Sequence, residues 1–228
     1  MASLARHSLV WLEPEGWKEA LDAAGDSCRE GLACWGARDW PAIVRRCDDD
    51  AAPDQVCLGV ALPPDPVSGA KRRIALRARQ ELVKKSLAPL NLEHAVPDMP
   101  GAWQPHLAAL CEQAGAAGIG FRVYGSAAMQ HLTGESYLTP SSDLDLLFLP
   151  TTSAQLAAGL ALLSVHTGAV PLDGEIVFPS GHAVAWKEWL GAQRAQTGCR
   201  VLAKELHAVR LMKPQDLLDT LEDRSCIH

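Results

Sequence analysis

The sequence of 228 residues contains no Cys-x-x-Cys pair, no run of 18 apolar residues and no apolar segment near its start that would serve as a secretory signal. The seven cysteines are an odd number at irregular spacing, which argues against a disulfide framework and against a zinc ribbon. Without a long apolar run there is no candidate transmembrane helix. We therefore expect a cytoplasmic protein with reduced thiols and no membrane association.

A basic charge excess is also missing. The formal net charge is −6 and the isoelectric point is about 5.7, which disfavours nucleic acid as the main partner. Apolar residues make up 48% of the chain and charged residues 21%, as in ordinary globular domains. The length fits one large domain or two small ones, and no internal repeat is visible.

Two prolines and a glycine lie close together in the segment 95–101, which predicts an irregular boundary. We predict an N-terminal domain over residues 1–97 and a second domain over 98–228. In the first domain we expect strands at 8–12 and 42–46, helical character over 17–35, a basic hairpin of 56–62 with 72–79, and a short helix at 81–87.

Helical and strand patterns alternate in the second domain. We expect helices at 104–117, 127–133, 153–163 and 215–223, strands at 121–124, 143–149 and 201–211, and a hairpin of 172–178 with 182–186. The predicted fold class is therefore α+β: a small N-terminal α/β domain, then a domain with a mixed sheet flanked by helices.

The first chemical signal is Gly125-Ser126, which follows an apolar strand and precedes a helix. Gly125 allows close approach of the backbone to a ligand, and Ser126 adds a hydroxyl. The N–H groups and the dipole at a helix N-terminus favour a phosphate at this position.

The second signal is the pair Asp143 and Asp145, two residues apart in a predicted strand. This spacing puts both carboxylates on one face of the strand, where they repel each other unless a cation lies between them. Mg²⁺ prefers such oxygen ligands, and Mn²⁺ accepts them as well. We predict a metal site at this pair.

Gly-Ser on a strand–helix turn, followed by Asp-x-Asp on the next strand, resembles the nucleotidyltransferase superfamily. That resemblance implies a third carboxylate on a later strand, for which Asp173 and Glu175 are the candidates. Glu175 precedes an apolar run and is slightly favoured. The segment 133–142 is longer than in many members of the superfamily, and we interpret it as a substrate loop.

A closer resemblance extends over nearly the whole chain. The segments 124–134, 137–147, 172–181 and 183–190, together with 6–12, 40–46, 71–77 and 201–211, are similar to the malonate decarboxylase holo-[acyl-carrier-protein] synthase family, also called phosphoribosyl-dephospho-CoA transferases. The resemblance implies transfer of a phosphoribosyl-dephospho-CoA group from triphosphoribosyl-dephospho-CoA to a serine of the acyl carrier subunit of malonate decarboxylase, with release of diphosphate.

Under this hypothesis Asp143 and Asp145 hold the metal, Glu175 or Asp173 assists the incoming serine, and Gly125 and Ser126 orient the phosphates. Two cations, Lys204 and Arg73, are further candidates for the coenzyme's phosphates. Lys204 interrupts an apolar run, and Arg73 shares a strand face with Arg77 and Arg79. A solvated strand face explains these arginines equally well.

Two other functions remain open at this point. One is a nucleotidyltransferase that acts on a small hydroxyl substrate with a common nucleotide. The other is a catalytically inactive fold of the same kind that serves as a binding module. The retention of Asp143, Asp145 and both candidates for the third carboxylate argues against inactivity.

Overall fold

The computed structural model describes residues 4–195 and 198–222, which form two compact units. The first unit contains the described residues up to Pro89 together with Met129–Tyr137. The second contains Leu90–Ala128 and the described residues from Leu138 onward. The chain therefore passes between the units after Pro89, after Ala128 and after Tyr137. None of the described helices has both the length and the apolar character needed to cross a membrane.

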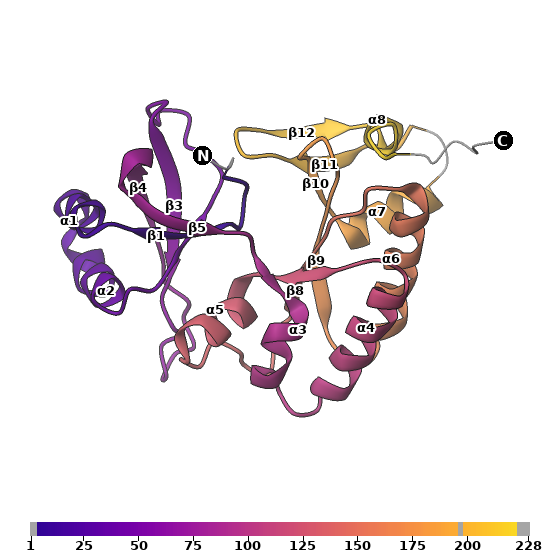
Figure 1. Cartoon of the computed structure of the whole chain (residues 1–228), viewed down its shortest axis with the longest axis horizontal. Coiled ribbons are helices and arrows are strands. Elements are labelled where there is room, and N and C mark those ends of the chain that lie inside the picture. Colours follow the sequence, from indigo (N-terminus) through magenta and orange to yellow (C-terminus); the bar gives the residue numbers. More distant parts are fainter. Residues whose placement is uncertain (1–3, 196–197, 223–228) are drawn as a thin grey trace. The chain divides into compact units, whose positions relative to one another are not determined.

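The first unit is a five-stranded antiparallel sheet in the order β4-β3-β2-β1-β5, with two helices (Figure 1). Its elements are β1 (Leu9–Leu12), α1 (Pro14–Ala23), α2 (Asp26–Ala37), β2 (Ala42–Val44), β3 (Gln55–Ala61), β4 (Arg73–Arg79), the 3₁₀ helix η1 (Gln80–Leu82) and β5 (Val83–Leu87). Trp17 of α1 and Trp35 of α2 are buried in its core.

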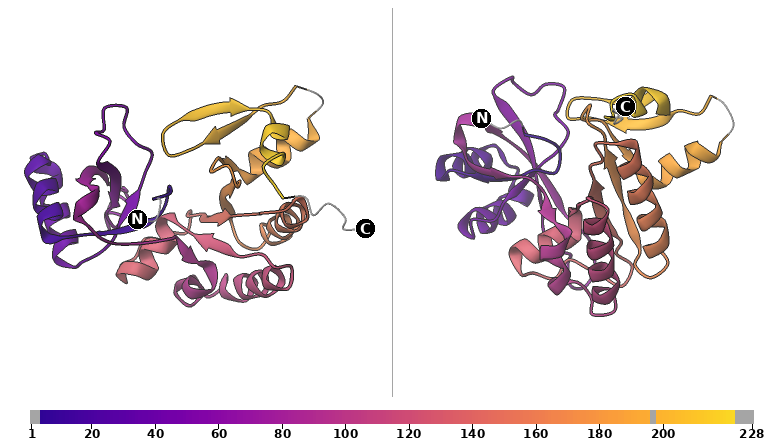
Figure 2. Two further views of the ribbon diagram at one scale, coloured as in Figure 1. Left: turned by 45° about the horizontal axis from the view of Figure 1, so that its top comes forward. Right: turned by 45° about the vertical axis from the view of Figure 1, so that its right-hand side comes forward.

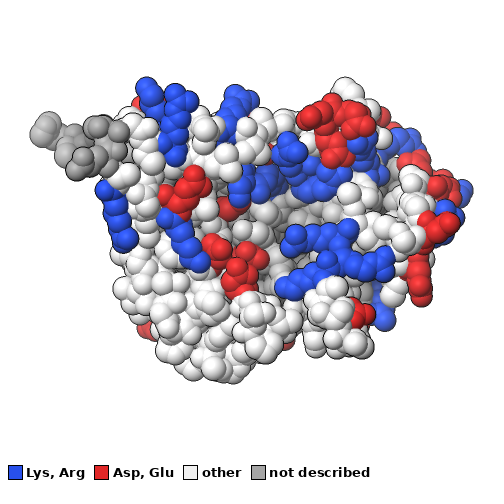
Figure 3. All heavy atoms as spheres, turned by 180° about the vertical axis from the view of Figure 1, so that it is seen from behind, with Lys and Arg blue, Asp and Glu red and all other residues white. Residues whose placement is uncertain are grey.

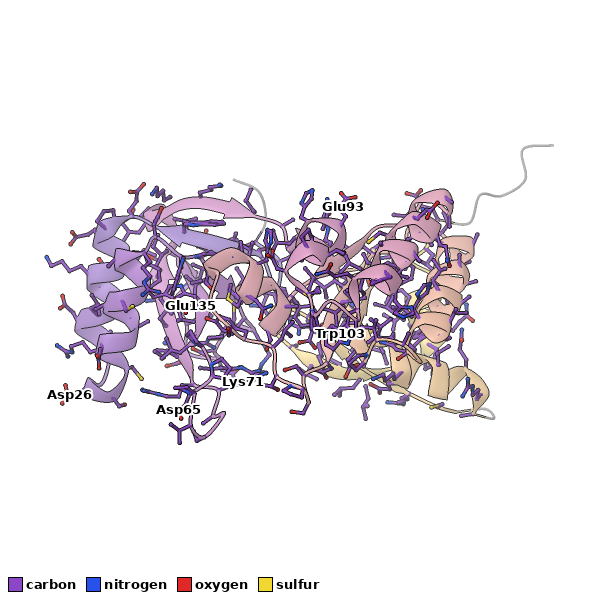
Figure 4. The ribbon with its side chains drawn as sticks, turned by 90° about the horizontal axis from the view of Figure 1, so that it is seen from below. Asp26, Asp65, Lys71, Glu93, Trp103 and Glu135 are labelled. Carbon is purple, nitrogen blue, oxygen red and sulfur yellow. The ribbon has the colours of Figure 1, made fainter. Side chains whose placement is uncertain are left out.

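The hairpin of β3 and β4 is confirmed over its full length, from Gln55 opposite Arg79 to Ala61 opposite Arg73. Its loop is organised by Asp65, whose carboxylate accepts hydrogen bonds from the backbone N–H groups of Val67 (3.1 Å) and Ser68 (2.7 Å). Figure 4 shows Asp65 and Lys71 in this loop. Strand alternation buries one face of β4 and leaves its arginines on the other.

The second unit is a seven-stranded mixed sheet in the order β12-β11-β10-β9-β8-β7-β6. Its elements are β6 (Leu90–Asn91), α3 (Leu92–Ala95), the 3₁₀ helix η2 (Val96–Asp98), α4 (Gln104–Ala116), β7 (Phe121–Val123), α5 (Gly125–Thr133), β8 (Leu144–Phe148), α6 (Ser153–His166), β9 (Leu172–Val177), β10 (Ala183–Ala185), α7 (Trp186–Arg194), β11 (Val201–Lys204), β12 (Val209–Met212) and α8 (Pro214–Leu218). The predicted α+β class is confirmed.

Helices α4 and α6 lie side by side and cover the core of this unit (Figure 1). The approach of α6 to the sheet depends on Gly159, since a Cβ there would stand 2.2 Å from the Phe148 ring of β8. Helix α6 begins with a cap in which the Thr152 hydroxyl accepts the N–H of Gln155 at 3.1 Å. Close packing at Gly159 fixes β8, the strand that carries Asp145.

Two local predictions are wrong. Residues 81–87 are a short 3₁₀ helix and an edge strand, since β5 pairs with β1. The segment 201–211 is two strands, β11 and β12, which form a hairpin seen from two sides in Figure 2. The predicted hairpin of 172–178 with 182–186 is confirmed by the pairing of β9 with β10, whose last residue is Ala185 because helix α7 begins at Trp186. The last residue of the predicted helix 215–223 lies outside the described residues.

Candidate functional site

The turn predicted to bind phosphate lies where β7 runs into α5. Gly125 has a φ of +65°, a left-handed conformation that favours glycine, and helix α5 starts at this residue, two positions before the predicted start. A Cβ at this position would lie 2.3 Å from Oδ2 of Asp145. Gly125 therefore places the N-terminus of α5 and the adjoining Ser126 directly against the Asp145 carboxylate.

The two aspartates differ in their surroundings. Asp145 lies within β8, half-buried between Leu144 and Leu146, which point into the core. The backbone N–H of Tyr124 donates to the carbonyl of Asp145 at 3.1 Å, which ties the turn to the strand. Asp143 precedes β8 and is exposed. The structure thus presents one fixed and one solvent-facing carboxylate two residues apart.

Strand β9 pairs in parallel with β8 and brings both candidates for the third carboxylate to the site. Asp173 is the register partner of Asp145, and Glu175 is the partner of Leu147, one step further along. Gly174 between them has a φ of +131°, and a Cβ there would lie 1.9 Å from the Leu146 carbonyl oxygen. Only glycine permits this close pairing, so Gly174 sets the register that aligns Asp173 with Asp145.

Each candidate for the third carboxylate has a lysine partner. Nζ of Lys204, on β11, donates to Oε1 of Glu175 at 2.9 Å, and Nζ of Lys187, on α7, lies 3.7 Å from Oδ1 of Asp173. The exposed fraction of the Glu175 side chain is 6%, whereas that of Asp173 is 38%. Asp173 is therefore the carboxylate of the two that a solvent-borne substrate can reach.

The donor set suits a hard divalent cation. Mg²⁺ commonly takes one or two protein carboxylates and completes its shell with water and substrate phosphates. Asp143 and Asp145 supply that number. No group of three or more His, Cys, Asp or Glu side chains is arranged to hold a metal within residues 4–195 and 198–222. The residues present fit a metal that shares its coordination with a phosphorylated substrate.

Arg73 belongs to the first unit, where it begins β4 and is exposed. Arg77 and Arg79, on the same strand face, have acidic partners: Asp48 and Asp50 for Arg77, and Glu19 and Glu81 for Arg79. On the face in Figure 3, Lys and Arg side chains likewise stand beside Asp and Glu side chains. Within the described residues, Arg73 has neither a hydrogen bond nor an ion pair from its side chain.

The arginine–aspartate network of the first unit was not predicted. Arg45 Nη2 and Arg77 Nε donate to Oδ2 of Asp48 at 2.7 and 2.9 Å. The hydrogen bonds from Arg45, followed by those from Arg77, hold the pKa of Asp48 well below its usual range. Arg45 and Asp48 are three residues apart at the end of an apolar strand, and this spacing is the sequence signal for the pair.

Part of the predicted substrate loop packs within the first unit. The Tyr137 hydroxyl donates to the carbonyl of Ala61 at 2.7 Å, and Glu135, labelled in Figure 4, forms an ion pair with Arg38 at 2.6 Å. Residues 139–142 form a turn of their own, in which Ser142 donates its backbone N–H to Thr139. The segment is thus anchored by specific contacts on both sides of Leu138.

Two family models match the chain. Residues 5–89 match the family model described as the phosphoribosyl-dephospho-CoA transferase MdcG N-terminal domain, and residues 86–215 match the model of its C-terminal domain. No solved structure matches the chain.

Curated relatives carry the name phosphoribosyl-dephospho-CoA transferase. One from Xanthomonas campestris pv. campestris (strain 8004) is 39% identical over 206 residues, which cover 87% of this chain and 94% of the relative. One from Xanthomonas euvesicatoria pv. vesicatoria (strain 85-10) is 39% identical over 91% of this chain and 93% of the relative. One from Bradyrhizobium diazoefficiens is 36% identical over 91% and 89%.

The protein is therefore an enzyme of the transferase class. Its chain belongs to the phosphoribosyl-dephospho-CoA transferase family, since the two family models together cover residues 5–215.

Proposed function

We propose that this enzyme transfers the phosphoribosyl-dephospho-CoA group from 2′-(5″-triphosphoribosyl)-3′-dephospho-CoA to a serine hydroxyl of the acyl carrier subunit of malonate decarboxylase. The observation that carries the proposal is the alignment of Asp145 with Asp173 across β8 and β9, beside the N-terminus of α5. Family membership supports the transferred group. The similarity of the chain to holo-[acyl-carrier-protein] synthases supports the acceptor.

The chemistry is a displacement at the α-phosphorus of the triphosphate. The serine oxygen forms a new bond to this phosphorus, and the bond from phosphorus to the oxygen that bridges to the β-phosphate breaks. The products are a phosphodiester, diphosphate and the proton of the serine hydroxyl. The enzyme must therefore hold the triphosphate, take up the proton and stabilise the negative charge on the diphosphate.

The residues of the second unit divide these tasks. Asp143 and Asp145 would hold Mg²⁺ or Mn²⁺, which supplies charge neutralisation for the triphosphate and the diphosphate. The backbone N–H groups at Gly125 and Ser126 bind phosphate oxygens through the positive end of α5. Asp173 accepts the serine proton, because it lies in register with Asp145 and its carboxylate is partly exposed.

Intact-mass spectrometry of the apo acyl carrier subunit tests this proposal. The subunit is incubated with the enzyme, Mg²⁺ and triphosphoribosyl-dephospho-CoA, or with ATP in place of the donor. A mass gain equal to phosphoribosyl-dephospho-CoA is expected with the specific donor alone. The gain should disappear with Asp145→Asn and persist with Asp216→Asn, a matched change at an exposed residue of α8. No gain with folded wild-type enzyme would overturn the proposed acceptor or donor.

A further inference from the structure

The carboxylate of Glu175 is buried. Among the described residues, Glu175 is the one Asp or Glu that is buried, with 5% of the residue exposed. An ionised carboxylate at such a position requires a charged partner or several hydrogen bonds, because burial removes its hydration. Lys204 Nζ supplies one such partner at 2.9 Å.

The order of strands in the sheet explains how Lys204 reaches Glu175. Lys204 lies on β11 and Glu175 on β9, with β10 between them. The register partners on β10 are Ala183 for Lys204 and Ala185 for Glu175. The Lys204 side chain crosses β10 over these two small side chains and reaches the carboxylate from the neighbouring strand.

The outer end of this ion pair faces solvent. The side chain of Lys204 is 35% exposed against 6% for Glu175. An ammonium group has three N–H donors, and the contact with Oε1 uses one of them. Because strand alternation puts Asp145, Asp173 and Glu175 on one face of the sheet, the remaining donors of Lys204 lie on the face that carries the site.

We propose that Glu175 is a positioning residue that holds Lys204 as a fixed cation for the diphosphate portion of the donor. The inference rests on the proposed function, since it assigns a task within that reaction. The ammonium group of Lys204 contacts the β- and γ-phosphate oxygens that leave as diphosphate. Asp173 is then the carboxylate that takes the serine proton.

Lys187 provides the contrast within the same unit. It lies 3.7 Å from Asp173, and the exposed fractions of the two side chains are 54% and 38%. Such a pair is solvated and loosely held. Lys187 is therefore the matched control, a lysine near a site carboxylate that lacks a buried anchor.

A double-mutant cycle with Glu175→Gln, Lys204→Met and the double variant tests the proposal. Two quantities are measured: the kcat and donor KM of transfer, and the affinity for inorganic diphosphate by titration calorimetry with Mg²⁺ present. Each single change should weaken diphosphate binding and raise the donor KM by about ten- to a hundredfold, as expected for a lost charge-assisted hydrogen bond. The double variant should bind diphosphate no more weakly than the single variant with the lower affinity.

Two further variants sharpen the result. Lys204→Arg keeps the cation and should retain most of the diphosphate affinity, whereas Lys187→Met should change it less than about threefold. Thermal unfolding of each variant establishes that it is folded. The Lys204→Arg variant and the binding assay keep the test decisive even if Glu175→Gln does not fold.

The inference is overturned if Glu175→Gln lowers kcat with diphosphate affinity unchanged, or if the effects of the two single changes multiply in the double variant. The first result would make Glu175 a catalytic base, and the second would show that Glu175 acts independently of Lys204. Absence of transfer by the wild type, with the diphosphate cycle behaving as expected, would instead count against the proposed donor or acceptor.

Discussion

The sheets of the two units each place charged side chains at alternate positions of one face, with opposite outcomes. On the first sheet Arg77 and Arg79 have two acidic partners each, and Arg45 shares Asp48 with Arg77. In the second unit, the side chain of Asp143, which lies just before β8, is exposed and has no ion pair or hydrogen bond among the described residues.

The same two-residue spacing of charged side chains therefore forms ion pairs that stabilise the first unit, whereas in the second unit it forms the candidate site. On β4, Arg77 and Arg79 each meet two carboxylates, so their charges are paired within the fold. Asp48 and Asp50 lie in the loop that follows β2 and pair with arginines of the adjoining strands. In the second unit, Lys187 and Lys204 come from elements that follow β10. Both side chains of the Lys187–Asp173 pair are exposed, whereas in the Lys204–Glu175 pair the lysine is partly exposed and the carboxylate is buried.

Asp145→Asn is expected to have the largest effect. Removal of this charge should lower kcat/KM for transfer by on the order of 10²–10³-fold, the range found when one electrostatic stabiliser of a transition state is removed. Asp143→Asn should act similarly. The melting temperature should change little, and Asp216→Asn should leave both quantities at wild-type values. Unchanged transfer in both variants would contradict the assignment of the second sheet.

Gly125→Ala should have the next largest effect. A Cβ cannot be placed at φ +65° without strain, and it would collide with the Asp145 carboxylate. We expect a loss of stability of about 1 kcal/mol from the backbone conformation, together with a loss of transfer well beyond what that amount of unfolding explains. Gly118→Ala is the control, because it shares the positive φ and has open space around a Cβ.

Asp48→Asn tests the first sheet. It should lower the free energy of unfolding by about 1–2 kcal/mol, since it weakens charge-assisted hydrogen bonds at a partly exposed site. Transfer activity per folded molecule should stay near that of the wild type. Urea unfolding measures the free energy of unfolding, and intact-mass assays on the same preparation measure transfer activity. A loss of activity without a loss of stability would contradict the structural role assigned to Asp48.

The pH dependence of this contribution has a definite sign. The folded-state pKa of Asp48 is depressed, so its stabilising effect is complete above the unfolded value of about 3.9 and disappears as the pH falls towards the folded value. Below about pH 4 the stability difference between wild type and Asp48→Asn should therefore shrink. A difference that grows on acidification would show that Asp48 is not held ionised by its arginines.

Arg73→Ala should have the smallest effect on stability, within about 0.5 kcal/mol, because its side chain has no partner among the described residues. Arg77→Ala should be the more destabilising of the two, since it removes contacts to Asp48 and Asp50. If Arg73 contacts the coenzyme's phosphates, its variant alone should raise the donor KM. Equal donor KM values for both variants would indicate that Arg73 belongs to a solvated strand face and does not bind the donor.

Much of the second unit could be predicted from local patterns. Apolar runs ending at Tyr124 and starting at Leu144 identified the two strands that flank α5, and the glycine between strand and helix identified the turn. The edge strand β5 was missed because Lys84 and Lys85 interrupt its apolar pattern. The β11–β12 turn was missed because residues 205–208 contain no glycine, proline or asparagine.

The partners of the carboxylates could not be predicted from sequence. Choosing between Asp173 and Glu175 requires the register of a parallel strand pair, which no local signal specifies, since β8 and β9 are joined through the whole of α6. The period-two spacing predicted that Asp173 and Glu175 share one face of the strand, but it gave no information on how deeply each is buried. Lys204 was singled out by its position in an apolar run, and its contact with Glu175 was not anticipated.

The parallel pairing of β8 with β9 also bears on when the site forms during folding. Every other strand pair among the described residues is antiparallel. A parallel pair forms only after its crossover helix has closed a long loop, and contacts of this kind are slow to form. The alignment of Asp145 with Asp173 therefore requires the crossover through α6 to be closed. In refolding experiments we expect recovery of transfer activity to lag behind recovery of the helical signal.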